Sequence, residues 1–372
     1  MTELQTKIQE QLESKFVFPD GVYSVLPTPF NDDDTIDYTS LKKLLWTQWI
    51  WEHRDPLVWE SSVTDKIVGI VLMGTTSESP TLEYDEKIQL LEFVAKFNSE
   101  RGIKKKIVVG VGGNNTKHVV EFAKKVSPLC DALMVTVPYY NRPQQRGIVD
   151  LFVQVSDACP DKPIIAYNIP GRTGLNMEPE TIHEVLTKCP NVTALKEASG
   201  DWVKVAKLCE LIKSSKVRVI GDSFKLFSGD DANMHTLMMD HGGSGVISVA
   251  SNVIPSAMCR LYERIEKICK GELEKKCADT YISCIGVFAK YLFAESNPVP
   301  VKDLLKNKCI FKNNTVRRPL MEMNDPELSH RLHVLCFRDM DIKMGPHWNY
   351  THEAHEQLSK KKEDRAEPFK NL

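Results

Sequence analysis

A lysine interrupts an apolar stretch of the sequence at position 196, within VTALKEASGD. Burial of an ammonium group in an apolar environment is costly, and it lowers the pKa of the amine from an ordinary value of about 10.4. A neutral lysine amine is a nucleophile that can form a Schiff base with a ketone. The position by itself also fits a lysine whose flexible stem reaches from a strand end into water. The neighbouring segments favour a catalytic Lys196.

Other segments carry groups that Schiff-base chemistry needs. The stretch YNIPGRTG contributes Tyr167, whose phenol can transfer protons while the carbinolamine and imine form. A Gly-Thr-Thr turn supplies Thr75 and Thr76, whose hydroxyls can relay protons and whose backbone amides can hold a carboxylate. Arg172 offers a planar guanidinium that matches a second carboxylate. This set of residues predicts Schiff-base catalysis.

The fold must bring these segments together, and each of them follows a short apolar run. Most runs are continuous rather than alternating, as expected of strands that are covered on both faces. Helical segments separate them, such as 83–102 and 116–126, and we expect Thr116 to be the N-cap of the latter. Eight strand–helix units in series predict an α/β fold, a closed (β/α)8 TIM barrel with its chemistry at the carboxyl ends of the strands. The runs are 21–30, 66–74, 105–113, 131–140, 163–170, 191–199, 223–229 and 244–251.

The barrel is expected to span residues 18–268, with an extension before it and a helical subdomain after it. An open doubly wound sheet is the alternative fold, but no GxGxxG motif follows the first strand. Strand signals fade in the last hundred residues, and 269–340 is expected to form a C-terminal helical subdomain. Residues 1–17 are expected to be an N-terminal extension, and the charge-rich residues 341–372 an extension that is partly disordered.

The composition excludes several classes of protein. The 372 residues carry a net charge of −2, so neither nucleic acid nor an anionic membrane surface is an expected partner. No apolar run approaches the roughly 20 residues of a transmembrane helix, and the N-terminus does not resemble a secretory signal or a transit peptide. Ten scattered cysteines without a CxxC pair indicate reduced thiols, several of them buried, and we expect a cytoplasmic location.

The segments after the apolar runs include GTTSESPTLEYDEK, YYNRP, YNIPGRTG, LKEASGD, SGDDA and GVISV, and NPVPVK follows further along the chain. In this order they resemble the segments of the dihydrodipicolinate synthase family. This family belongs to the superfamily of pyruvate-dependent class I aldolases that also contains N-acetylneuraminate lyase. The resemblance implies a homo-oligomeric lyase, a dimer or tetramer, that joins pyruvate and aspartate semialdehyde on the diaminopimelate route to lysine. It also implies that the enzyme uses no metal and no cofactor, because the imine forms with substrate pyruvate.

The resemblance implies a role for each residue of the catalytic set. Lys196 would form the imine with pyruvate, and Tyr167 beside it would donate and accept protons. Thr75 would link Tyr167 to Tyr140, which in this family reaches in from a neighbouring subunit. Thr76 would bind the pyruvate carboxylate through its amide and hydroxyl.

The resemblance also implies residues for substrate binding. Arg172 would bind the carboxylate of aspartate semialdehyde, and its GRTG element separates the synthases from the neuraminate lyases, which lack this arginine. Gly229 and the backbone of Ile247 would face the bound substrate. The chain departs from the family at Ser77, where glycine is usual. If this position needs a positive φ, serine would cost about 1 kcal/mol or more.

A feedback site for lysine, which the family carries, would fall on seven residues outside the catalytic set. An acid found in many bacterial members is His118 here, and Lys87 adds positive charge where a cation would bind, so both argue against lysine inhibition. The seven residues are Ser79, Pro80, Tyr84, Lys87, Asn114, His118 and Tyr139.

Two other functions are compatible with this sequence. One is another pyruvate-dependent class I aldolase, acting on a 2-keto-3-deoxy sugar acid or on 4-hydroxy-2-oxoglutarate. The other is a non-catalytic barrel that serves as a binding protein, against which the complete Lys–Tyr–Thr–Tyr set argues. Replacing the aldehyde separates the aldolases, and a covalent adduct with pyruvate separates enzyme from binding protein.

Several other polar residues favour structural interpretations. The histidines of PHWNYTHEAHEQL lack the HExxH spacing of zinc proteases, so we expect solvated side chains rather than a metal site. Glu197 is expected to be a solvated acid at a strand end. Asp230 and Asp231 precede a helical segment, and we expect them to act as N-caps.

Overall fold

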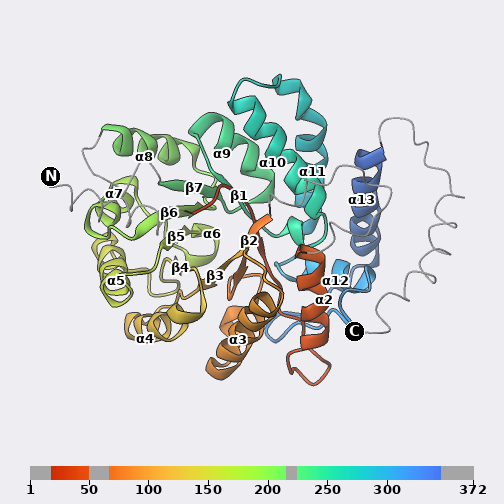
Figure 1. The fold of residues 1–372 in the computed structure, drawn as a ribbon, viewed down its shortest axis with the longest axis horizontal. Coiled ribbons are helices and arrows are strands. Elements are labelled where there is room, and N and C mark those ends of the chain that lie inside the picture. Colours follow the sequence, from red (N-terminus) through yellow and green to blue (C-terminus); the bar gives the residue numbers. More distant parts are fainter. Residues whose placement is uncertain (1–17, 50–66, 215–223, 345–372) are drawn as a thin grey trace, which may run out of the picture.

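The computed structural model describes residues 18–49, 67–214 and 224–344, which contain a closed barrel of eight parallel strands surrounded by helices (Figure 1). Each strand pairs with the next one in the chain, and β8 pairs with β1. The predicted barrel is confirmed, and the open doubly wound sheet is wrong. The strands are β1 (Gly21–Val25), β2 (Ile67–Leu72), β3 (Lys106–Gly110), β4 (Ala132–Thr136), β5 (Ile164–Asn168), β6 (Val192–Glu197), β7 (Lys225–Ser228) and β8 (Gly245–Ser248).

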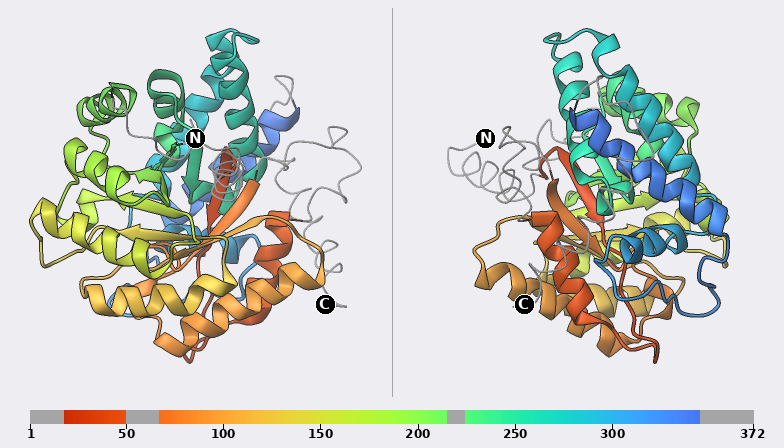
Figure 2. Two further views of the ribbon diagram at one scale, coloured as in Figure 1. Left: turned by 60° about the vertical axis from the view of Figure 1, so that its left-hand side comes forward. Right: turned by 90° about the vertical axis from the view of Figure 1, so that its right-hand side faces the viewer.

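Helices cover the outside of the barrel on all sides that Figure 2 shows. Helix α4 begins one residue after its N-cap Asn115, whose side chain accepts a hydrogen bond from the backbone N–H of His118. The expected N-cap Thr116 is therefore wrong by one residue. The covering helices are α2 (Tyr38–Trp49), α3 (Tyr84–Glu100), α4 (Thr116–Val126), α5 (Gln145–Ala158), α7 (Pro179–Lys188), α8 (Trp202–Ser214), α9 (Met234–His241) and α10 (Pro255–Cys269), and a short α6 (Pro170–Thr173) follows β5.

The side chains of each strand alternate between the barrel interior and the layer under the helices, because successive residues of a strand point to opposite faces. One hydrophobic cluster fills the interior and includes Tyr23, Met134, Tyr167, Phe227 and Ile247. A larger cluster lies between the strands and the helices. Two-sided burial explains why the apolar runs of the sequence are continuous rather than alternating.

Three further helices follow the barrel, α11 (Asp279–Leu292), α12 (Val299–Asn307) and α13 (Pro326–Met344). They lie together on one side of the barrel, where α13 contacts both α11 and α12 (Figure 1). A 3-10 turn at Lys275–Cys277 lies between α10 and the start of α11. The helical character of this region is confirmed, while its exact boundaries at 269 and 340 stay predictions.

A buried ion pair joins these C-terminal helices to the loop after β2. In α12, the Nζ of Lys302 lies 2.5 Å from a carboxylate oxygen of Glu78, and both side chains are 1% exposed or less. Lys302 also donates to the carbonyl oxygen of Thr315 at 2.8 Å. The other oxygen of Glu78 accepts a hydrogen bond from the backbone N–H of Arg317 at 2.8 Å. The pair is therefore hydrogen-bonded on both sides, which a buried pair requires in order to stabilise a fold.

We expect the substitution Lys302→Met to destabilise the fold by about 3–5 kcal/mol, because it leaves the carboxylate of Glu78 buried without its cation. Urea unfolding followed by circular dichroism measures this loss. Lys306→Met on the same helix is the matched control, since Lys306 is exposed and donates an exposed hydrogen bond to the side-chain oxygen of Asn314, and it should change stability by less than about 0.5 kcal/mol. Equal effects of the two substitutions would contradict the role of the ion pair.

Two other sequence-based expectations can be compared with the described part of the chain. All ten cysteines are free thiols, and five of them are buried, as expected. Within these residues, no helix has both the length and the apolar character that crossing a membrane requires. The N-terminal extension, the segment 50–66, the histidines at 347, 352 and 355, and most of the C-terminal extension lie outside the described residues.

Candidate active site

Lys196 lies inside the barrel, near the carboxyl end of β6. Its strand neighbour in the register is Tyr167 of β5, so both side chains project to the same face of the sheet. The Nζ of Lys196 lies 4.0 Å from the centroid of the Tyr167 ring, and Lys196 is only 5% exposed. The interpretation of Lys196 as a solvated lysine at a strand end is therefore wrong.

The surroundings of Lys196 favour its neutral, nucleophilic form. The pKa of this amine is lowered to about 7, chiefly by burial; the negative charge of Asp231 opposes this shift, and the positive charge of Arg172 adds to it. A large fraction of the amine is consequently neutral near pH 7. The cost of a buried lysine and its reactivity have the same origin.

We expect the rate of imine formation with limiting pyruvate to rise about tenfold between about pH 6 and pH 8 and then to level off, because the Lys196 amine loses its proton around pH 7. Borohydride trapping at a series of pH values measures this rate. A solvated lysine would instead give a rate that rises up to about pH 10. If the rate of imine formation reached half its maximum near pH 10 instead of near pH 7, burial would not be what lowers the pKa of Lys196.

Tyr167 carries the phenol nearest to this amine. Burial raises the pKa of Tyr167, whereas the charge of Arg172 and hydrogen bonding with Thr75 lower it. The phenol is thus protonated at neutral pH and can act as an acid. Of the predicted relay, the structure brings Thr75 close to Tyr167.

The turn after β2 holds Thr76, Ser77 and Glu78 in a buried arrangement. The hydroxyl of Thr76 accepts a hydrogen bond from the side-chain amide of Asn297 at 2.9 Å. Ser77 donates from its hydroxyl to the carbonyl oxygen of Leu26 at 2.6 Å. The left-handed backbone lies at Glu78, with a φ of 55°, and not at Ser77. Serine in place of the family's glycine therefore carries no strain of this kind and adds a buried hydrogen bond.

Arg172 lies on the one-turn helix α6 and is exposed. Its guanidinium is close enough to lower the pKa of both Lys196 and Tyr167. The helix ends at Gly174 with a φ of 70°, where a residue with a side chain would be strained. The carbonyl oxygen of Gly174 accepts a hydrogen bond from Nε of Arg142 at 2.9 Å, which ties this loop to the one after β4.

Gly229 directly follows β7 and Ile247 lies in β8, the next two strands of the barrel. A Cβ atom at Gly229 would lie 2.7 Å from the Cβ of Ala198 and 3.2 Å from Cε of Lys196. Gly229 therefore makes room for the lysine stem and for the end of β6. The side chain of Ile247 belongs to the interior cluster that contains Tyr167.

Tyr140 does not join this group within the chain. Its backbone has a φ of 66°, and its side chain is 87% exposed. A large exposed aromatic side chain on a strained backbone is a candidate for an interface with another molecule. Its predicted place in a neighbouring subunit's relay stays a prediction.

Glu197 and Asp231 are more deeply buried than the sequence indicated. Glu197 is 7% exposed rather than solvated, and it accepts hydrogen bonds from the side-chain amide of Asn168 and from the backbone N–H of Ser199 at 2.6 Å. Asp230 accepts from the backbone N–H of Ala232, so its N-cap role is confirmed.

Asp231 is a buried carboxylate that sequence reasoning assigned wrongly to helix capping. One of its oxygens accepts hydrogen bonds from the backbone N–H groups of Val249 and Ala250, directly after β8. Burial raises the pKa of Asp231 to about 6, and its charge acts on Lys196. The SGDDA segment contains this acid, but its hydrogen-bond partners become evident only when β7 pairs with β8 and brings the ends of the two strands together.

The residues of the expected feedback site lie outside the barrel interior. Tyr84 and Lys87 of α3 approach the ring of Phe122 on α4, with Nζ of Lys87 5.9 Å from the ring centroid. The carbonyl oxygen of Asn114 accepts a hydrogen bond from Asn141. His118 and Pro80 are exposed, Tyr139 is 38% exposed and Ser79 lies in a 3-10 turn, so a feedback function of the set stays a prediction.

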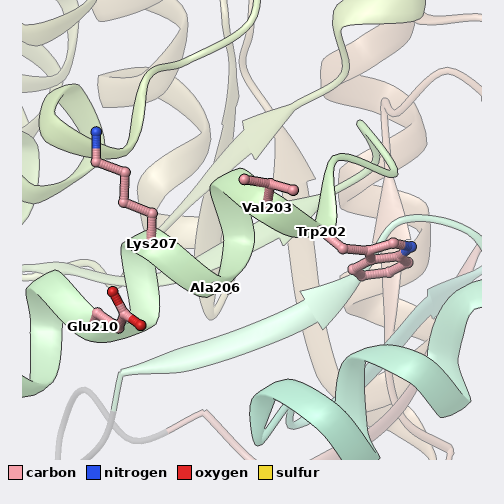
Figure 3. A pocket seen from close by; sticks show the side chains of 5 residues that line it. All are labelled: Trp202, Val203, Ala206, Lys207 and Glu210. Carbon is pink, nitrogen blue, oxygen red and sulfur yellow. The ribbon is translucent and has the colours of Figure 1, made fainter.

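A hollow of about 460 Å³ lies along α8, apart from the residues described above (Figure 3). None of the predicted site residues lines it. Among the residues that the structure describes, no three His, Cys, Asp or Glu side chains are grouped in a way that could hold a metal ion. The hollow is lined by Trp202, Val203, Ala206, Lys207 and Glu210.

Comparisons with known proteins agree on one family. The model of the dihydrodipicolinate synthetase family matches residues 19–335. The 4-hydroxy-tetrahydrodipicolinate synthase of Thermosipho africanus is 36% identical over 307 residues, which cover 82% of this chain and 94% of that protein. The corresponding protein of Listeria welshimeri is 40% identical over 258 residues, which cover 69% of this chain and 81% of that protein.

Solved structures resemble this chain as well. The crystal structure of dihydrodipicolinate synthase from Thermotoga maritima has a TM-score of 0.74 and 28% sequence identity, and the match covers 87% of this chain and 99% of that one. The enzyme from Aquifex aeolicus has a TM-score of 0.72 and 31% identity, and the match covers 86% and 98% of the two chains.

Proposed function

This chain belongs to the dihydrodipicolinate synthetase family, and on that premise we propose that it is a 4-hydroxy-tetrahydrodipicolinate synthase, a Schiff-base lyase of lysine biosynthesis. Its substrates would be pyruvate and aspartate semialdehyde. The observation that carries the proposal is the buried amine of Lys196, held over the phenol ring of Tyr167 inside the barrel.

The first half of the proposed reaction takes place on Lys196. Its neutral amine adds to the ketone carbon of pyruvate, and the carbinolamine loses water to give an imine. Tyr167 supplies the proton that the departing hydroxyl needs and takes up a proton in the reverse direction. Loss of a proton from the pyruvate methyl group then gives the enamine.

The second half joins the two substrates. The enamine carbon attacks the aldehyde carbon of the semialdehyde, and the aldehyde oxygen becomes a hydroxyl. The amino group of the semialdehyde then attacks the imine carbon, which closes the ring and releases the amine of Lys196. Arg172 is suited to hold the carboxylate of the semialdehyde, since its exposed guanidinium lies at the mouth of the site and acts on both Lys196 and Tyr167.

A homo-oligomer is part of the proposal. The exposed Tyr140 would complete the relay through Thr75 and Tyr167 of a neighbouring subunit. Thr76 would hold the carboxylate of pyruvate.

The proposed chemistry requires no metal ion and no cofactor, because the imine forms between Lys196 and the substrate itself. A cytoplasmic location remains a prediction.

A panel of aldehydes tests the substrate. Pyruvate is paired with aspartate semialdehyde, with sugar-derived aldehydes and with glyoxylate, and the product of each condensation is quantified. We expect turnover with aspartate semialdehyde to exceed the others, and Arg172→Ala to lower its kcat/KM by roughly 100-fold, the loss of a bidentate charged contact. The control is Arg146→Ala in α5, also an exposed arginine near this end of the barrel.

Two outcomes would overturn the proposal in different ways. Full activity of Arg172→Ala with aspartate semialdehyde would remove the basis for the second substrate and favour another aldolase. Absence of any borohydride-stable adduct between pyruvate and the wild-type protein would leave only a binding protein.

A further inference from the structure

Asn297 makes a buried contact with the turn that would hold the keto acid. It lies just before α12, in the NPVPVK segment, and its side-chain amide donates to the hydroxyl oxygen of Thr76 at 2.9 Å across 221 residues of sequence. Asn297 is 6% exposed and Thr76 is 2% exposed. A direct bond between two buried side chains this far apart in sequence fixes both of them in place.

The direction of this hydrogen bond determines what the Thr76 hydroxyl can do. A threonine hydroxyl has one proton to donate and two lone pairs that accept. Asn297 occupies one lone pair, and within the described residues this is the single polar partner of the hydroxyl. The proton of Thr76 is therefore left for a ligand, and a carboxylate is the acceptor that such a donor binds best.

Asn297 is itself held in place by the helix that follows it. Lys302 of α12 forms the buried ion pair with Glu78, two residues after Thr76. Arg317 donates from its backbone N–H to the same carboxylate, and its guanidinium pairs with Glu86 of α3 at 2.5 Å. The C-terminal region thus contacts the turn after β2 at several points, and Asn297 is the one that reaches the substrate-binding threonine.

We propose that Asn297 is a positioning residue for the keto acid, which orients the Thr76 hydroxyl as a proton donor to the substrate carboxylate. The inference rests on the proposed function, because it assumes that Thr76 faces pyruvate. It makes the C-terminal helices part of the active site rather than an appendage to the barrel.

The test compares ligands with and without a carboxylate. Pyruvate and acetone are each trapped on the enzyme with borohydride at increasing concentration, and the half-saturating concentration is measured by mass spectrometry. For Asn297→Ala we expect this concentration to rise roughly 10-fold for pyruvate, the effect of one weakened charged hydrogen bond, and to stay within about 2-fold of wild type for acetone. A general loosening of the site would impair both ketones equally.

Two further variants examine the donor and the coupling. Asn297→Asp offers only acceptors, so it should weaken pyruvate binding more than Asn297→Ala does. Thr76→Val removes the hydroxyl that accepts the hydrogen bond from Asn297. The double variant Thr76→Val with Asn297→Ala should therefore bind pyruvate no more weakly than Thr76→Val alone. The matched control is Asn313→Ala, which loses one exposed hydrogen bond to Asp32 in the same region and should leave both ketones unaffected.

The possible outcomes separate this inference from the proposed function. If the wild type forms no pyruvate adduct, the proposed function fails. If the wild type forms it and Asn297→Ala shows an unchanged half-saturating concentration, or an equal loss for acetone, the positioning role is overturned while the proposed function stands. Additive effects of Asn297→Ala and Thr76→Val would overturn it as well.

Discussion

Lys196→Arg is expected to abolish adduct formation with pyruvate and to lower turnover by at least about 1000-fold, as loss of a covalent nucleophile does. An arginine guanidinium stays protonated in proteins and cannot add to a ketone. The measurement is intact mass after borohydride reduction with pyruvate, together with steady-state turnover. Wild-type protein should gain one pyruvate per chain.

Two controls accompany the Lys196 variant. Lys207→Arg on α8 exchanges an exposed lysine that pairs with Glu180, and it should keep full activity. Lys196→Met is a second variant that places no charge in the barrel, so a loss of activity shared by both variants cannot come from a buried guanidinium. An adduct that persists in either variant would show that another lysine carries the chemistry.

Tyr167→Phe is expected to lower kcat by about 10²–10⁴-fold, the usual contribution of general acid–base catalysis. The substitution keeps the ring 4.0 Å from the amine, so the packing around Lys196 is preserved, and only the phenolic proton is removed. Because burial raises the pKa of Tyr167, the phenol of the wild type carries this proton at neutral pH. Stopped-flow measurement of enamine formation identifies the step that slows.

Tyr23→Phe is the matched control for this prediction. Tyr23 also lies in the barrel interior, and its hydroxyl donates to the carbonyl oxygen of Pro19, just before β1, at 2.9 Å. Its loss should cost about 1 kcal/mol of stability and leave kcat within a few-fold of wild type. Activity of Tyr167→Phe that is equally close to wild type would remove the tyrosine from the mechanism.

The contacts between α12 and the turn after β2 change how the C-terminal region is understood. The ion pair of Lys302 and Glu78 stabilises the turn, and the hydrogen bond from Asn297 orients the threonine within it. A chain truncated before α12 would lose the cation and the backbone donor that pair with Glu78. The barrel and the C-terminal helices are therefore coupled in stability and, by our inference, in substrate binding.

The sequence by itself determined the barrel and the pair of Lys196 and Tyr167. Continuous apolar runs indicate strands that are covered on both faces, and apolar residues that recur about every 3.6 residues indicate helices, so short windows of sequence are enough to find both. Consecutive parallel strands pair as neighbours, and residues near the ends of two such strands must then lie side by side. The lysine in an apolar run was informative because burial of its charge is so costly.

Tertiary structure alone decided the surroundings of this pair. The partner of Thr76 lies 221 residues away, and that of Glu78 on the same distant segment, and no local pattern encodes contacts of such separation. Glu197 was expected in water because an acid at a strand end usually is, but it is buried in the layer between the strands and the helices, where the side-chain amide of Asn168 on the adjacent strand donates to it. Whether a polar group is buried depends on where its hydrogen-bond partner lies in space, and closure of the barrel, not the adjacent sequence, brings that partner to it.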